Sequence, residues 1–143
     1  MSWTEQEYQE YLKKQNKTKN TEYTKNGKIR LIFDIKPISK DNCKITNKYG
    51  RQFLPQKYKD WEEAIGYMAR QQYKGKPLTK PLVVFCWFYF KDRICRDVGN
   101  YQKSILDALK GICFNDDSQI VDLHLFKRII GEEKILIEIE VEK

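Results

Sequence analysis

The sequence predicts a mixed α/β fold (α+β-like), a single small domain in which helices pack on a mixed β-sheet. Three observations predict it: a continuously apolar run at 82–90, two segments of alternating hydrophobicity at 121–130 and 134–142, and two amphipathic stretches with helical spacing. With 143 residues, of which 41% are hydrophobic and 13% aromatic, the chain is long enough for one core and short for two. We therefore expect one folded domain at 28–143, preceded by an extension at 1–27.

The extension at 1–27 is predicted to begin as a helix and continue as a linker. Thr4 followed by Glu7 is a capping-box pattern, which predicts a short helix over 4–14. The residues that follow are rich in Asn, Lys and Thr, a composition typical of linkers. The acidic N-terminus does not match a signal peptide, and no apolar run reaches about 20 residues. We expect a cytoplasmic protein without a membrane segment.

The first half of the domain is expected to contain a strand, a basic loop and a helix. The segment 29–35 is rich in β-branched and aromatic residues, as strands are. The segment 37–53 is polar and basic, so we expect a loop with one or two short strands. A helix should follow Pro55 and stop at Gly75, because apolar residues recur there at steps of three and four. These residues are Tyr58, Trp61, Ile65 and Met68.

The second half is expected to contain a buried strand, a helix and a hairpin. The apolar run 82–90 should form a central strand that is covered on both faces. A helix from about 100 to 110 is ended by Gly111. The two alternating segments, joined by Gly131 and two glutamates, predict an antiparallel hairpin. On its second strand Ile135, Ile137, Ile139 and Val141 should face the core, and Glu138, Glu140 and Glu142 should face water.

The chain carries a formal charge of +7, and this charge is unevenly distributed. The segment 36–60 holds seven basic residues against two acidic ones, whereas 132–143 is net acidic. A basic zone suggests a polyanionic partner, usually nucleic acid; simple solubility is the alternative explanation. The four cysteines lack CxxC spacing and are expected to be reduced thiols. The single histidine argues against a His-based metal centre or a Ser-His triad.

Acidic residues flank the helix predicted after 99. Asp97 comes just before it, and Asp116 and Asp117 come just after it, so a short helix could return this pair towards the first acid. Lys103 lies between them on a polar helix face. Carboxylate oxygens suit Mg²⁺, and a bound metal could activate water for attack on a phosphodiester. The basic residues nearby, Lys91, Arg93 and Arg96, would suit a phosphate group.

Each of these residues also has an ordinary structural explanation. Asp97 could stabilise the N-terminus of the helix, where negative charge is favourable. Lys103 and Asp107 could form a common i, i+4 pair. Asp116 and Asp117 could belong to a plain turn. Residue types and spacing alone leave both explanations open.

The pattern as a whole resembles the RusA-type Holliday junction resolvases, a family common in phages and prophages. The family signature is an Asp, a spacer, a second Asp, Asn, two residues and Lys, then a helix with Asp-Ala-Leu and an Asp-Asp-x-Gln-[Val/Ile] turn. The N-terminal half is similar too, with Pro37, Ser39 and Asn42 in a basic loop before Gly50-Arg51. The resemblance covers about 28–143. The signature positions matched are Asp97, Asn100, Lys103, Asp107-Ala108-Leu109, Asp116-Asp117 and Gln119-Ile120.

The resemblance implies a homodimer that cleaves four-way DNA junctions by paired nicks in DNA recombination and repair. It implies Mg²⁺ as the cofactor, with Mn²⁺ able to substitute. By the same resemblance Asp97 and Asp117 are metal ligands with Asp116 close by, and Lys103 is the essential cation. Basic residues in the loop and before the helix are candidates for contacts to DNA phosphates: Lys40, Lys44, Lys48, Arg51, Arg93 and Arg96.

The chain departs from the family pattern at Gly99, where the second catalytic Asp belongs. Glycine supplies no ligand, and loss of a group that acts directly on the reaction commonly costs orders of magnitude in rate. Three explanations are open: an inactivating substitution, replacement of the ligand by Asp116, or a protein that binds junctions without cutting them. The expected function is a metal-dependent junction endonuclease, weakened or inactivated at this position. The alternative is a non-cleaving, structure-selective junction-binding protein.

Overall fold

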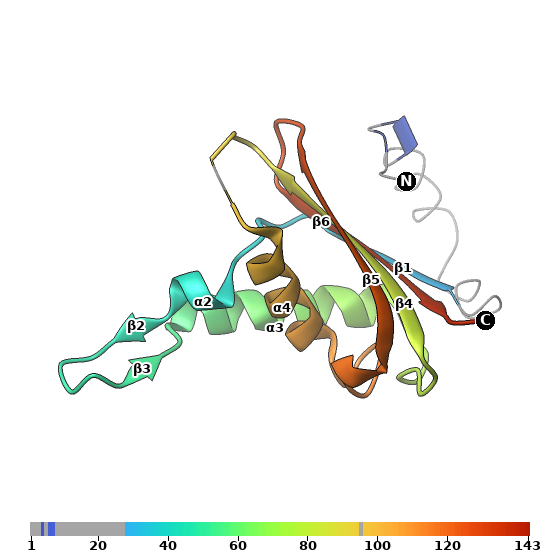
Figure 1. The fold of residues 1–143 in the computed structure, drawn as a ribbon, viewed down its shortest axis with the longest axis horizontal. Coiled ribbons are helices and arrows are strands. Elements are labelled where there is room, and N and C mark those ends of the chain that lie inside the picture. Colours follow the sequence, from blue (N-terminus) through green and yellow to red (C-terminus); the bar gives the residue numbers. More distant parts are fainter. Residues whose placement is uncertain (1–3, 5, 8–27, 95) are drawn as a thin grey trace.

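The structure, a computed structural model, describes residues 4, 6, 7, 28–94 and 96–143. It confirms a mixed α/β domain in which helices pack on a four-stranded sheet, with a second, two-stranded sheet beside it (Figure 1). The elements follow in this order: β1 (Lys28–Phe33), α2 (Lys40–Cys43), β2 (Ile45–Thr46), β3 (Gln52–Phe53), α3 (Gln56–Gln72), β4 (Leu82–Phe90), α4 (Val98–Leu109), the 3₁₀ helix η1 (Asp117–Gln119), β5 (Ile120–Ile129) and β6 (Lys134–Val141).

The strands of the large sheet lie in the order β1-β6-β4-β5. β4 is antiparallel to β6 on one side and parallel to β5 on the other, so the predicted hairpin of 121–130 with 134–142 is wrong. Both segments do form strands, but β4 lies between them. The nine residues of β4 are apolar throughout, and such a strand is most stable where other elements cover both faces and strands pair with both edges. The stabilisation from burying β4 at the centre of the sheet therefore outweighs the tendency of the two segments to pair directly across the turn at Gly131.

β4 contributes alternate side chains to two hydrophobic clusters, one on each face of the sheet. Every second residue from Val84 to Phe90 points into the main core. Trp87 and Tyr89 point the other way, into a smaller cluster with Ile32 of β1 and Leu136 of β6. The expectation that this strand is covered on both faces is confirmed for 86–90, whereas Val83 and Phe85 on the second face are half-buried.

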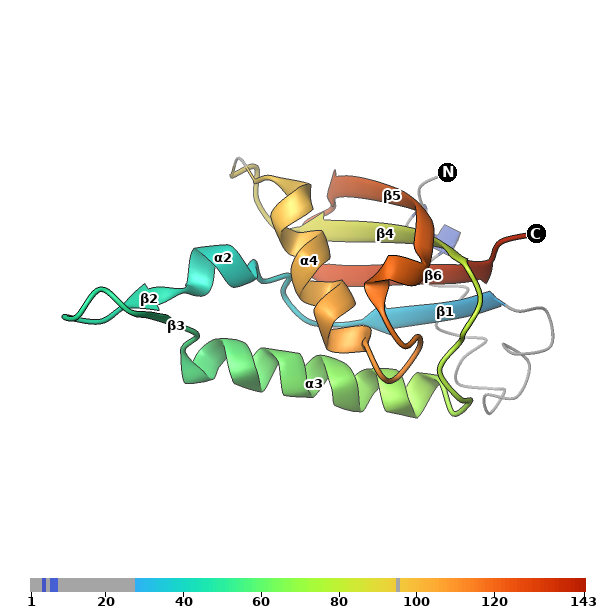
Figure 2. The same ribbon diagram turned by 60° about the horizontal axis from the view of Figure 1, so that its bottom comes forward.

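α3 and α4 cover one face of the large sheet (Figure 2). α3 begins after Pro55 as predicted, but it ends at Gln72 rather than at Gly75. At this end the N–H of Tyr73 donates to the carbonyl of Ala69 at 2.8 Å, and the chain then becomes extended. The helix presents a narrow apolar face to the sheet. Its buried residues are Tyr58, Trp61, Ile65, Gly66 and Ala69.

α4 lies across the sheet between the ends of β4 and β5 (Figure 2). It is followed by Gly111, whose φ of 80° lies in the left-handed region that glycine tolerates, so the predicted stop is confirmed. One face of the helix is almost wholly buried. The residues of this face are Tyr101, Ser104, Ile105, Leu106, Ala108 and Leu109.

The basic segment 37–53 contains the short helix α2, which the sequence pattern did not predict. Ser39 caps it, because its Oγ accepts a hydrogen bond from the N–H of Asn42 at 3.4 Å. The N–H of Lys40 donates to the buried Oγ of Ser104 at 2.7 Å and so ties α2 to α4. Beyond α2, β2 and β3 form the short strands that were expected, and they project from the body of the domain (Figure 1).

The burial of the isoleucines of β6 confirms that they face inward, but one residue predicted to face outward is buried. The alternate isoleucines of β6 are at most 1% exposed. Glu138 was expected to face water but is 8% exposed. Its carboxylate lies 2.7 Å from the Nζ of Lys28 and 3.3 Å from the Nε of Arg30. These two partners supply the positive charge that allows an acid to be buried.

The predicted N-terminal helix falls largely outside the described residues, as does the predicted linker. Among the residues that are described, the N–H of Glu7 donates to the Oγ1 of Thr4 at 3.1 Å, as the capping pattern predicts. In the part of the chain that the structure describes, no helix combines the length and the apolar character needed to cross a membrane.

The cysteines that the structure describes carry no disulfide, in agreement with their spacing in the sequence. They are Cys43, Cys86 and Cys113. Burial raises the pKa of the Cys113 thiol to about 12 and also raises the pKa of Cys86, so both remain protonated near neutral pH. Cys95 lies outside the described residues.

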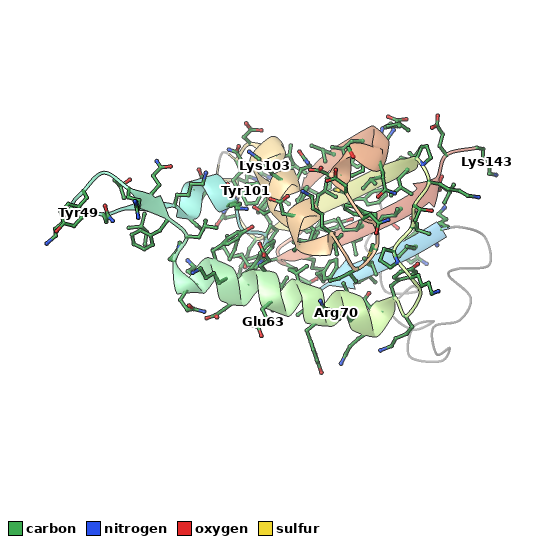
Figure 3. The ribbon with its side chains drawn as sticks, turned by 90° about the horizontal axis from the view of Figure 1, so that it is seen from below. Tyr49, Glu63, Arg70, Tyr101, Lys103 and Lys143 are labelled. Atoms are coloured by element: carbon green, nitrogen blue, oxygen red, sulfur yellow. The ribbon has the colours of Figure 1, made fainter. Side chains whose placement is uncertain are left out.

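Gln72 ties the end of α3 to the outer edge of β1. Its Oε1 accepts from the N–H of Ile32 at 2.7 Å, and its Nε2 donates to the carbonyl of Ile32 at 2.6 Å. Replacing Gln72 with Ala should lower the free energy of unfolding by about 1–3 kcal/mol, because two strand-edge groups lose these partners. Urea denaturation measures this loss. Glu63→Ala, at an exposed position of the same helix (Figure 3), is the control, and an equal loss there would contradict the prediction.

Candidate active site

The first acidic position lies at the N-terminal end of α4. Asp97 is the residue that caps this helix, and its Oδ1 accepts a hydrogen bond from the N–H of Gly99 at 2.9 Å. A carboxylate at this place also meets the positive end of the helix dipole. Asp97 therefore has the structural role that its position suggested, and its side chain is nevertheless exposed to solvent.

Gly99 is exposed in the first turn of α4, and nothing in its surroundings requires a glycine. A Cβ added there would lie 3.3 Å from the Oδ1 of Asp97, a tight contact that a small shift of this exposed side chain relieves, and no other neighbour lies within 4 Å. Its backbone is not among the positive-φ glycines, which are Gly50, Gly111 and Gly131. The departure from the signature therefore removes a carboxylate without being demanded by the fold.

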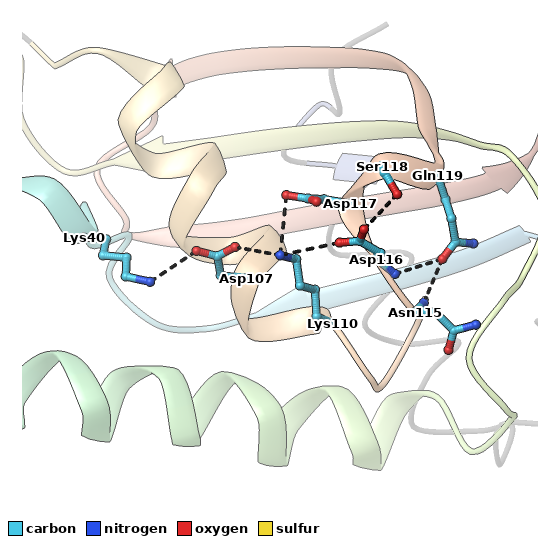
Figure 4. A network of polar contacts seen from close by, with 8 residues as sticks. All are labelled: Lys40, Asp107, Lys110, Asn115, Asp116, Asp117, Ser118 and Gln119. Atoms are coloured by element: carbon cyan, nitrogen blue, oxygen red, sulfur yellow. Dashed lines mark hydrogen bonds and ion pairs between the residues drawn. The ribbon is translucent and has the colours of Figure 1, made fainter.

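The second acidic group surrounds one lysine at the C-terminal end of α4 (Figure 4). The Nζ of Lys110 lies 3.6 Å from Asp107, 3.7 Å from Asp116 and 3.6 Å from Asp117. Desolvation works against its charge, but the three carboxylates outweigh this and raise the pKa of Lys110. The hydroxyl of Ser118 donates to Asp116 at 2.8 Å and is the main cause of a lowered pKa at that carboxyl group. Lys110 thus supplies the positive charge that the acids need.

Gln119 holds the acidic turn against the segment that precedes β4. Its Oε1 accepts from the N–H groups of Asn115 and Asp116, each at 2.9 Å (Figure 4). Its Nε2 donates to the carbonyl of Leu78 at 2.8 Å and to that of Lys80 at 3.1 Å. The glutamine of the Asp-Asp-x-Gln motif therefore has a structural role, since it positions the two acids relative to the sheet.

α4 keeps the two acidic groups apart. It has 12 residues, so at 1.5 Å per residue it spans about 18 Å. Asp97 precedes its first residue, whereas Asp116 and Asp117 lie beside Lys110, after its last residue. The return of these acids towards Asp97 is therefore not seen within one copy. Among the described residues, no three acidic, histidine or cysteine side chains are close enough together to hold a metal ion.

Lys103 is exposed on α4, between the two acidic ends (Figure 3). Asp107, one turn later, pairs with Lys40 at 3.3 Å and with Lys110 at 3.6 Å. The i, i+4 pair of Lys103 with Asp107 is not among the ion pairs of the described residues. Lys103 therefore presents its charge to solvent, as a contact to a phosphate would require.

Four of the residues predicted to contact DNA are exposed. Lys44, Lys48 and Arg51 lie on and around the β2–β3 hairpin, and Arg93 lies in the loop between β4 and α4. The hairpin and the start of α4 are separate parts of the surface (Figure 2). The predicted phosphate contacts are therefore distributed over the domain rather than gathered at one point.

The other two predicted DNA contacts, Lys40 and Arg96, are less exposed and lie close to acidic side chains. Lys40 pairs with Asp107 and is half-buried. The guanidinium of Arg96 lies 2.8 Å from the carboxylate of Asp92 and 4.4 Å from the centre of the Phe90 ring. The hydrogen bond between Arg96 and Asp92 lowers the pKa of Asp92 and raises the pKa of Arg96. A DNA phosphate would have to compete with these partners.

Comparison with known proteins agrees with the resemblance seen in the sequence. The family model described as Endodeoxyribonuclease RusA matches residues 34–140. The chain belongs to the RusA family. A protein of Aquifex aeolicus (strain VF5) named Crossover junction endodeoxyribonuclease RusA is 30% identical over 113 residues, which cover 78% of this chain and 90% of the relative.

The acidic residues of the RusA signature lie towards both ends of α4, Lys103 is exposed between them, and Ala108 and Leu109 are buried. Sequence reasoning missed the contacts of Lys110. A single lysine after a helix is common, so it was not singled out. The available signal was its position between Asp107 and the acidic pair of the turn. Gln119 was recognised as part of the RusA signature, but its role in holding the turn becomes evident only from its contacts.

Lys110 should compete with a divalent cation for the same carboxylates. Replacing it with Gln removes one positive charge beside three acids and should tighten Mg²⁺ binding about fivefold. Titration calorimetry measures this affinity, and the rise of the melting temperature with Mg²⁺ gives a second measurement. Lys74→Gln, at an exposed position after α3, is the matched control. Equal Mg²⁺ affinity in all three proteins would show that Lys110 does not oppose a metal ion.

Proposed function

We propose that this chain is an endonuclease that resolves four-way DNA junctions by paired nicks, acting in the cytoplasm in DNA recombination and repair. The RusA family match carries the proposal, because it spans 34–140 and so includes every candidate residue from Asp97 to Asp117. The relative from Aquifex aeolicus is named as a crossover junction endodeoxyribonuclease. Exposed carboxylates at both ends of α4, with Lys103 between them, support the same chemistry.

The proposed cofactor is Mg²⁺, with Mn²⁺ able to replace it. The donor set fits, since Asp97, Asp116 and Asp117 expose carboxylates and hard divalent cations prefer oxygen ligands. Asp97 and Asp117 would hold the ion, with Asp116 close by. When bound, such an ion polarises phosphoryl oxygens and lowers the pKa of a water ligand. Lys103 would neutralise negative charge on the phosphate.

The proposed assembly is a homodimer whose two copies complete each other's sites. Asp97 and Asp117 lie at opposite ends of a 12-residue helix about 18 Å long, so one copy does not bring both to one ion. Across a twofold axis, two antiparallel α4 helices would set the N-terminal end of each beside the C-terminal end of the other. Twofold symmetry also suits a substrate that must be cut at two related positions.

The second candidate function is binding to junctions without cleavage. Gly99 favours it, because this position has no carboxylate where the RusA signature has one. The exposed basic residues of the hairpin would serve binding in either case, since contacts of Lys and Arg with phosphates supply much of the affinity for DNA.

Restoring the acid at position 99 should increase cleavage. A Cβ at this position meets only Asp97, and negative charge is favourable in the first turn of a helix, so Gly99→Asp should fold normally. In Mg²⁺ it should cut a synthetic four-way junction at least about 100-fold faster than the unmodified chain. Gly99→Asn, similar in shape but uncharged, is the matched control and should not gain activity.

Each other outcome of this comparison has its own meaning. If the unmodified chain cuts as fast as Gly99→Asp, another group already replaces the missing ligand and the prediction is wrong. If both bind the junction and neither cuts it, the non-cleaving function is supported. If neither prefers the junction to a duplex, both proposed functions are contradicted.

Two inactive variants should complement each other if the copies share their sites. Asp97→Asn and Asp117→Asn are prepared separately, either in the unmodified chain or in Gly99→Asp, depending on which of the two cleaves. They are then mixed so that subunits exchange. In a mixed dimer one shared site carries both substitutions and the other carries neither. Half of the dimers in an equal mixture are mixed, so about a quarter of all sites should be intact. Nicking of a four-way junction measures the recovery. No recovery would mean that each site is built within one copy.

A further inference from the structure

The β2–β3 hairpin projects beyond the rest of the domain (Figures 1 and 2). Residues 44–53 form a hairpin arm with Tyr49 at its tip (Figure 3). Two pairs of residues connect its strands, Ile45 with Phe53 and Thr46 with Gln52. None of its apolar side chains belongs to the hydrophobic clusters of the described core. The arm is therefore a surface element whose composition is not explained by packing.

Asn47 organises the turn at the tip of the arm. Its Oδ1 accepts from the N–H of Tyr49 at 2.9 Å and from that of Arg51 at 3.0 Å. Its backbone N–H donates to Arg51 at 2.9 Å, and its carbonyl accepts from Gly50 at 3.0 Å. Gly50 has a φ of 78°, a conformation that glycine adopts without strain. These bonds hold the backbone at the tip, so presenting Tyr49 to a ligand costs little backbone conformational entropy.

The arm exposes large apolar side chains. Tyr49 is 81% exposed, Phe53 is 47% exposed and Ile45 is 45% exposed. Phe53 and Ile45 are direct cross-strand partners, so they lie together on one face of the hairpin. Apolar side chains gathered on a projecting element mark a binding surface rather than a packing surface.

The same arm is basic. Residues 42–54 contain Lys44, Lys48 and Arg51 and no acidic residue. The Nζ of Lys48 lies 5.1 Å from the centre of the Tyr49 ring. Within the part of the chain that the structure describes, neither Lys48 nor Arg51 forms an ion pair with an acid. Aromatic rings interleaved with basic side chains are the composition of surfaces that bind bases and phosphates together.

Chemical complementarity decides between the possible occupants of this surface. A second copy of the chain carries acidic side chains but offers no base faces, and the homodimer proposed above pairs α4 with α4 rather than with the arm. A nucleic acid offers phosphates for the basic side chains and base faces for the aromatic ring. DNA is therefore the partner whose chemistry matches both features.

We propose that Tyr49 recognises the branch point of a four-way junction by stacking on a nucleobase there, while Lys48 and Arg51 contact neighbouring phosphates. This inference rests on the proposed function and adds a residue that selects the junction. In an intact duplex each base is covered by neighbours, whereas a base at a branch point can lose a neighbour and expose a face. Stacking on that face would let the protein distinguish a junction from a duplex. The basic side chains do not make this distinction, because both substrates carry the same phosphates.

The test compares Tyr49→Ala, Tyr49→Phe and Tyr67→Ala with the unmodified chain. Tyr67, 63% exposed on α3, is the matched control, because it is also an exposed tyrosine. Tyr49→Ala should weaken binding to a synthetic four-way junction about tenfold and binding to a duplex of the same length by less than about twofold. Tyr49→Phe keeps the aromatic ring and should bind as the unmodified chain does. A junction with 2-aminopurine at the branch point should show a change of fluorescence with the unmodified chain that Tyr49→Ala does not produce.

The outcomes separate this inference from the function on which it rests. If the unmodified chain prefers the junction and Tyr49→Ala keeps that preference, this inference is overturned and the proposed function stands. If the unmodified chain has no preference for the junction, the proposed function and this inference fall together. If Tyr49→Ala weakens junction and duplex binding equally, Tyr49 is a general DNA contact and not a branch-point residue. If it changes the oligomeric state in sedimentation, the arm belongs to a subunit interface, which also overturns the inference.

Discussion

The placement of β4 between β6 and β5 is the constraint on which the rest of the structure depends. Nine consecutive apolar residues need cover on both faces and pairing on both edges, and only the centre of the sheet provides both. Because β5 runs parallel to β4, the chain has to cross back over the sheet between them, and α4 is the long helix of that crossover. The length of α4 therefore sets the distance between Asp97 at one end and Asp117 at the other.

This arrangement gives each acidic group a partner within the fold. Asp97 accepts a hydrogen bond from the first turn of α4, and Lys110 offsets part of the negative charge of the acids beyond the helix. Helix capping and one lysine therefore offset part of the charge of these exposed carboxylates. The same two interactions also define the charges that an incoming cation or phosphate would meet at the two ends of α4.

Local pattern predicted the elements of this fold better than their arrangement. The bounds of β4 follow from its unbroken apolar run, but alternation in β5 and β6 identifies strands without saying that a third strand lies between them. α2 has four residues, which is too short for any periodicity to show. The family signature pointed to Asp97 and Asp117, whereas their separation depends on the direction of a crossover. The contacts of Lys110 depend on how the chain turns after α4, which no local pattern specifies.

The pairing of β1 with β6 has a consequence for biosynthesis. Residue 28 lies opposite 140 and residue 33 opposite 135, so the first strand of the sheet finds its partner only after the last strand has been made. Contacts so distant in sequence slow folding. β4 also leaves the ribosome before β5 and β6, the two strands that pair with it. Its apolar residues are unprotected until those strands have been made. The chain is therefore most exposed to aggregation while it is being translated, and a chaperone that binds extended apolar segments would have β4 as its natural target.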